Sequence, residues 1–139
     1  DHRDLHLSLR RQRQMCIRDR YYNGYRIQEV IYQGTKYPLG FKVVTMDLKS
    51  LGLKNNPNII QYTIGEWVSL DPCEITEDDS DYGGMWVART LSGAKELKKY
   101  MKTYHNKETR IFKSCLGKIL FANKYRVKTD KILIFEEII

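Results

Sequence analysis

The sequence has 139 residues, of which 42% are hydrophobic and 29% are charged, and its formal net charge is +7. This length predicts one domain, and the composition argues against wholesale disorder. No apolar run reaches the roughly 18 residues that a membrane-spanning helix needs, and the first residues have no apolar signal-peptide centre, so we expect a soluble, cytoplasmic protein. Cys16, Cys73 and Cys115 lack metal-ligand or redox spacing and are expected to be free thiols.

Residues 1–20 differ in composition from the rest of the chain. They contain six Arg and no Lys, whereas residues 21–139 contain four Arg and fourteen Lys, together with all ten Tyr and all nine Gly. The run QMCIRDR at 14–20 resembles translated sequencing-adapter read-through, so we expect residues 1–20 to be a non-native or disordered extension. The alternative is an arginine-rich arm that binds nucleic acid. Without this segment the net charge is eighteen minus fourteen, or +4, which is ordinary for a single domain.

Two strands are predicted in the first part of the remaining chain, because β-branched and aromatic residues are concentrated there. They are YRIQEVIY at 25–32 and FKVVTM at 41–46, the second introduced by Pro38 and Gly40. We expect the two strands to pair as a hairpin across a loop of about eight residues.

The middle of the chain predicts short elements joined by turns. Asp47 is a plausible N-cap for a single helical turn that stops at Gly52. Beyond it the sequence predicts a turn at 55–58, short strands at 59–64 and 66–70, and an exposed acidic loop at 71–84.

The strongest periodic pattern predicts a helix at about 91–104, capped by Thr90 or Ser92. Its expected buried face consists of Leu91, Ala94, Leu97, Met101 and Tyr104. Further strands are predicted at 85–89, 110–116, 119–122, 125–127 and 132–136. The sequence therefore predicts an α+β fold, a single compact domain in which one principal helix packs on a mainly antiparallel sheet.

Metal-dependent and nucleophilic chemistry is poorly supported by the motifs. The chain has no HExxH, CxxC, GxSxG or Walker sequence, and His105 is the only histidine after residue 20. The carboxylates of the acidic loop lack EF-hand spacing, so a solvated loop is favoured over a cation site. These carboxylates are Glu74, Glu77, Asp78, Asp79 and Asp81.

Basic and aromatic residues alternate on the predicted C-terminal strands. Arg126 and Lys128 would share one strand face, where basic groups suit phosphate and an aromatic ring can stack on a base. The alternative is an ordinary charged face of a half-solvated sheet. The candidates for phosphate are Arg110, Arg126 and Lys128, those for base stacking are Trp86 and Tyr125, and the second choices are Arg89 and Asn123.

The run DYGGMWVA at 81–88, followed by Ala94 and the helix, resembles a segment of small ADP-ribosyltransferase-like proteins. The resemblance covers about sixty residues, 81–139, and implies NAD or an ADP-ribose-like ligand. That family begins its NAD site with Arg or His on an early strand, and the matching FKVV at 41–44 has neither. The family also carries a late catalytic glutamate, for which Glu136 and Glu137 are candidates outside a Glu-x-Glu motif.

These observations predict a non-enzymatic domain that binds a nucleotide-like anionic ligand. The size and the lysine- and tyrosine-rich composition are also common among small phage proteins of low-GC bacteria, some of which sequester nucleotide signals of host defence. Two alternatives stay open: an ADP-ribosyltransferase-like enzyme that uses NAD, and a nucleic-acid or protein-interaction module.

Overall fold

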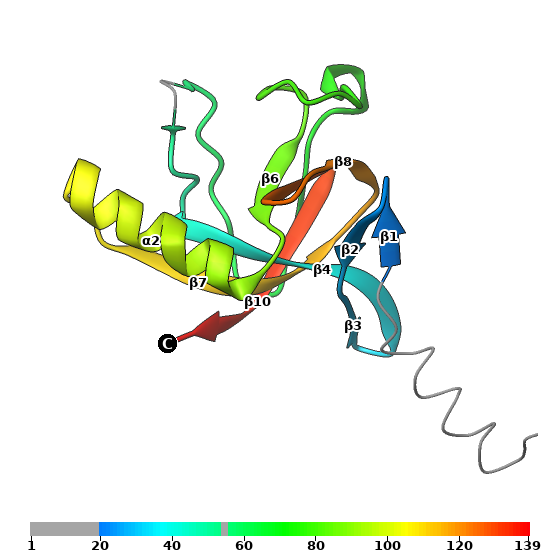
Figure 1. Ribbon diagram of the computed structural model, residues 1–139, viewed down its shortest axis with the longest axis horizontal. Helices are drawn as coiled ribbons and strands as arrows, with labels where there is room; N and C mark the ends of the chain where they lie inside the picture. The colour runs from blue at the N-terminus through cyan, green and yellow to red at the C-terminus, as the bar shows by residue number, and fades with distance from the viewer. Residues whose placement is uncertain (1–19, 54–55) are drawn as a thin grey trace, which may run out of the picture.

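The computed structural model describes residues 20–53 and 56–139 (Figure 1). The predicted extension at 1–20 lies outside the described residues except for Arg20, which begins strand β1 (Arg20–Tyr22). Strand β1 pairs with β2 (Tyr25–Ile27) in a separate two-stranded hairpin. Among the described residues no helix, α2 (Leu91–His105) included, is long and apolar enough to cross a membrane.

The prediction of an α+β fold is confirmed. Among the described residues, eight strands form one antiparallel sheet in the order β5-β10-β7-β4-β6-β9-β8, with β3 paired to β4. The strands are β3 (Glu29–Tyr32), β4 (Thr35–Thr45), β5 (Trp67–Ser69), β6 (Met85–Ala88), β7 (Thr109–Leu116), β8 (Ile119–Ala122), β9 (Arg126–Thr129) and β10 (Lys131–Ile138). Figure 1 shows α2 lying along β7 and β4, near the middle of this sheet.

The two faces of the sheet carry two separate apolar clusters. Leu39, Phe41 and Val43 alternate along β4 and pack with Ala94 of α2 on the helix side. The opposite face is the larger cluster; it includes Val44, Tyr62, Met85, Val87, Phe112, Leu116, Val127, Ile132 and Ile134. Alternate residues of β4 therefore serve different clusters, as a strand buried on both faces requires.

Helix α2 begins and ends with the expected capping geometry. The Thr90 hydroxyl accepts a hydrogen bond from the Gly93 amide at 3.1 Å, and Asn106 closes the helix in the left-handed region. Ala94 and Met101 are buried, as the periodicity predicts. The prediction for Tyr104 is wrong: its side chain is 73% exposed and its ring lies 5.0 Å from that of Tyr100.

The predicted eight-residue hairpin loop is also wrong. Strands β3 and β4 are joined by a two-residue turn, Gln33 and Gly34, in which both residues have positive φ. Strand β4 consequently begins at Thr35 and runs through Pro38, a residue usually confined to strand edges. Pro38 is tolerated because β4 changes partner there, from β3 at 35–38 to β7 at 39–45.

The segment between β4 and β5 differs from the prediction as well. The expected helical turn at 47–52 is absent, because Leu48 adopts positive φ and Lys49 forms an isolated bridge with Gln61. Asp47 accepts a hydrogen bond from the Thr45 hydroxyl instead of capping a helix. The predicted strand at 59–64 reduces to that single bridge, and the chain there forms one side of the pocket described below.

Candidate functional site

A cavity of about 480 Å³ lies beside β4 and β6. These strands pair only at Phe41 and Ala88, so they diverge beyond that point. Lys42 and Val43 both line the cavity, although neighbouring residues of a strand point to opposite faces. The cavity therefore wraps around the open edge of β4, and we call it the β4–β6 pocket. Helix α2, residues within 50–53 and 56–62, the residues just before β6, and Tyr125 and Arg126 also line it.

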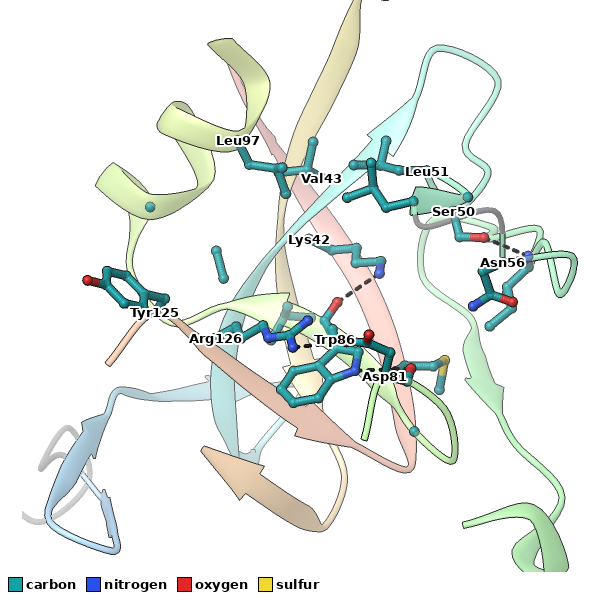
Figure 2. A pocket seen from close by; sticks show the side chains of 18 of the residues that line it. Lys42, Val43, Ser50, Leu51, Asn56, Asp81, Trp86, Leu97, Tyr125 and Arg126 are labelled. Atoms are coloured by element: carbon teal, nitrogen blue, oxygen red, sulfur yellow. Dashed lines mark hydrogen bonds and ion pairs between the residues drawn. The ribbon is translucent and has the colours of Figure 1, made fainter. Parts of the chain in front are cut away.

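Lys42 provides a positive charge inside the β4–β6 pocket. Its ammonium donates a hydrogen bond to the Trp86 carbonyl at 2.8 Å (Figure 2). The same ammonium lies 5.5 Å from the centre of the Tyr62 ring. Burial lowers the pKa of Lys42 to about 8. The ion pairs formed among the described residues do not include Lys42. Sequence reasoning missed this residue, and the available signal was a lysine inside the apolar strand FKVV.

A stacked arginine and tryptophan form one wall of the same pocket. The Arg126 guanidinium lies 3.7 Å from the centre of the Trp86 ring and pairs with the Asp81 carboxylate at 3.0 Å. The Trp86 indole in turn donates a hydrogen bond to the Asp81 carbonyl at 3.3 Å, and these side chains are seen together in Figure 2. Tyr125, which is 70% exposed, also lines the pocket. Three of the predicted ligand residues, Trp86, Tyr125 and Arg126, therefore meet at one site.

Lys128 lies on the same face of β9 as Arg126 but does not line the pocket. Its side chain is fully buried beneath the acidic loop, where the ammonium donates to the Thr76 hydroxyl at 2.8 Å and to the Asp78 carbonyl at 3.1 Å. The Asp78 carboxylate lies 3.6 Å from the same ammonium. The loop itself is mostly exposed, as the sequence predicted, and the buried Lys128 holds it in place.

The paired glycines before β6 make room for this arrangement. A β-carbon added at Gly84 would lie 2.5 Å from the Lys128 side chain. Gly83 has a φ of +80°, and a β-carbon there would collide with Thr76. The two glycines therefore allow the acidic loop to close over Lys128, and Gly84 also lines the β4–β6 pocket.

Arg89 and Asn123 support the backbone around the site. The Arg89 guanidinium donates to the Lys124 carbonyl at 3.0 Å and to the Arg26 carbonyl at 2.8 Å, which ties the β1–β2 hairpin to the β8–β9 turn. The Asn123 side-chain oxygen accepts hydrogen bonds from the amides of Tyr125 and Arg126. Neither Arg89 nor Asn123 lines the pocket.

Arg110 is also outside the pocket, and its charge is already matched. Its guanidinium forms a bidentate pair with Glu137, at 2.9 and 2.8 Å. The hydrogen bonds from Arg110 hold the pKa of the Glu137 carboxyl below its usual range. Glu136 pairs with Lys113 at 3.8 Å. The two glutamates suggested by the ADP-ribosyltransferase resemblance therefore do not line the β4–β6 pocket.

Within residues 20–53 and 56–139, no cluster of three or more His, Cys, Asp or Glu side chains could hold a metal ion. Comparison of the chain with protein-family models, with curated proteins and with solved structures finds no match.

Proposed function

We propose that this protein binds a nucleotide-like anionic small molecule in the β4–β6 pocket. The observation that carries the proposal is the Lys42 ammonium, which lines a cavity of about 480 Å³ and has no carboxylate partner among the described residues. Pockets for small molecules commonly measure about 300–1,000 Å³ and combine an apolar lining with a few polar groups. An unpaired ammonium in such a place favours a ligand that brings a negative charge.

The aromatic lining favours a ligand that also has a planar ring. Trp86 and Arg126 form a stacked wall, and the exposed rings of Tyr82, Tyr100 and Tyr125 also line the pocket. Purine and pyrimidine rings stack on aromatic and guanidinium planes with favourable energies. A phosphate near Lys42 and a base near Trp86 would use both features at once.

The pattern of charge pairing favours a small ligand over long nucleic acid. Arg110, Arg126 and Lys128 each pair with a carboxylate of the protein itself. Binding of long nucleic acid depends on many basic groups that contact phosphates together. Because these three side chains are already neutralised, they support binding of long nucleic acid less well than the β4–β6 pocket supports binding of a mononucleotide.

Isothermal titration calorimetry at pH 7 with AMP, cyclic mononucleotides, ADP-ribose and NAD tests the proposal. We expect at least one of them to bind, and Lys42→Met to weaken that binding about tenfold, which corresponds to the loss of one charge-assisted contact. Wild-type affinity should also fall between pH 7 and pH 9, because the Lys42 ammonium loses its proton in that range. Lys42→Met should show no such fall.

The matched control is Lys113→Met on the neighbouring strand β7, because Lys113 is paired with Glu136 and lies outside the pocket. This variant should bind like the wild type. The absence of heat with every ligand, or equal affinity in Lys42→Met, would contradict the proposal.

A further inference from the structure

Lys42 differs in its surroundings from lysines that serve only solubility. Its side chain leaves β4, passes close to the Tyr62 ring and ends in a hydrogen bond to the Trp86 carbonyl. This hydrogen bond joins β4 to β6 just beyond the Phe41–Ala88 pair, where the two strands no longer form backbone pairs. One acceptor therefore holds the nitrogen in a defined position while it lines an open cavity.

The charged groups around the cavity leave this nitrogen without a strong counter-charge. Asp81 is engaged with Arg126, and Glu96 of α2, which also lines the cavity, forms no ion pair with Lys42. The remaining titratable groups among the described lining residues are Arg126 and the phenols of Tyr62, Tyr82, Tyr100 and Tyr125. Burial raises the pKa of Tyr62, so this neighbour stays neutral at physiological pH. No carboxylate among the described residues pairs with Lys42 to raise its pKa again, so burial lowers that pKa to about 8.

We infer that Lys42 is an amine nucleophile that condenses with the carbonyl group of an aldehyde or ketone bound in the β4–β6 pocket. A desolvated lysine in an apolar pocket is an established means of obtaining a neutral, reactive amine near neutral pH. The aromatic lining favours carbonyl compounds that carry a planar ring. The inference requires access to the pocket but does not rest on nucleotide binding.

The reaction forms one carbon–nitrogen double bond and releases one water molecule. The nitrogen lone pair attacks the carbonyl carbon, and the carbonyl π electrons move to oxygen, which takes up a proton as the nitrogen loses one. The carbinolamine then loses its hydroxyl group as water, and the nitrogen gives up its second proton as the imine forms. No oxidant or reductant is consumed in this step.

Reductive trapping of the full chain with benzaldehyde and sodium cyanoborohydride tests the inference. Peptide mass spectrometry measures the rate of benzylation at Lys42, Lys113 and Lys49, the last two being paired with Glu136 and Asp47. We expect Lys42 to react about 100-fold faster at pH 8, since about half of its amine is neutral there, against roughly one part in 250 for an ordinary lysine. Its rate should rise with pH and level off above a midpoint near 8.

Equal rates at Lys42 and Lys113, or a midpoint for Lys42 near the ordinary lysine value of about 10.4, would overturn the inference. Lys42→Arg should remove the fast-labelled site while Lys113 still reacts at its wild-type rate, which shows that the fold persists. If a nucleotide binds, it should slow labelling at Lys42. Fast labelling without any nucleotide binding would refute the proposed function alone, and nucleotide binding without fast labelling would refute this inference alone.

Discussion

Replacing Lys128 with alanine is expected to lower the free energy of unfolding by about 2–4 kcal/mol, in the range of other large-to-small substitutions at fully buried positions. The side chain is completely buried, and its methylene groups pack against Gly84. Truncation would leave a cavity beneath the acidic loop and remove the donor to the Thr76 hydroxyl and the Asp78 carbonyl. Urea unfolding followed by circular dichroism measures the change.

Two further variants separate packing from charge at this position. Lys128→Met keeps most of the buried chain and should cost less than Lys128→Ala, because apolar replacement of a buried charge is often tolerated. Lys118→Ala is the matched control, since Lys118 also pairs with the acidic loop, through Glu77 at 3.3 Å, but its side chain is 63% exposed. Exposed pairs contribute about 0–1 kcal/mol. A Lys128→Ala variant as stable as Lys118→Ala would show that the burial of Lys128 contributes little.

Replacing Trp86 with alanine is expected to weaken nucleotide binding by about 10- to 100-fold, as removal of a base-stacking ring does elsewhere. Trp86 supplies the indole plane of the pocket wall and keeps Arg126 stacked upon it at 3.7 Å. Its loss would therefore remove one stacking surface and release the other. Calorimetry with the ligand that binds the wild type most tightly gives the affinity ratio.

Trp67 offers a close control for this experiment. Its ring also lies beneath a cation, with the Lys131 ammonium 4.6 Å away, but it sits on β5 and does not line the pocket. Trp67→Ala should retain wild-type affinity. Because the chain contains only two tryptophans, Trp67→Phe would leave Trp86 as the sole indole reporter, and a ligand on this wall should change its fluorescence. Equal affinity losses in both alanine variants would exclude a specific role for Trp86.

The fold class could be predicted because its signals are local. The capping threonine and the spacing of Ala94 and Met101 define the helix within one segment, and alternation of β-branched residues identifies most strands. The errors arose where local signals point elsewhere. Gln33 gives no sign of a left-handed turn, and Pro38 argues against a strand unless its change of partner is known.

The candidate site was only partly predictable, for a different reason. Trp86 and Arg126 were predicted from their residue types on two separate predicted strands, and their stacking follows from the pairing of β6 with β9 in the structure. Lys128 has the same sequence signature as Arg126, yet it is buried beneath the acidic loop, whereas Arg126 lines the pocket. Both pair with carboxylates 45 to 50 residues away in the sequence. Lys42 could not be predicted as a site residue, because it lines a pocket that exists only where β4 and β6 diverge. Whether a strand cation faces a ligand or a carboxylate is a long-range property.

The pairing of β4 with β7 has a consequence for how the chain reaches this structure. Partners in that ladder, from Leu39 with Cys115 to Thr45 with Thr109, are more than sixty residues apart. Closing so large a loop costs conformational entropy before the contacts of the central ladder can form. We therefore expect this domain to fold slowly, as topologies of high contact order do. During synthesis, β4 emerges long before β7. Residues 39–45 of β4 therefore lack their β7 partner during that interval. Their exposed backbone edge can pair with the wrong strand, which the completed sheet prevents.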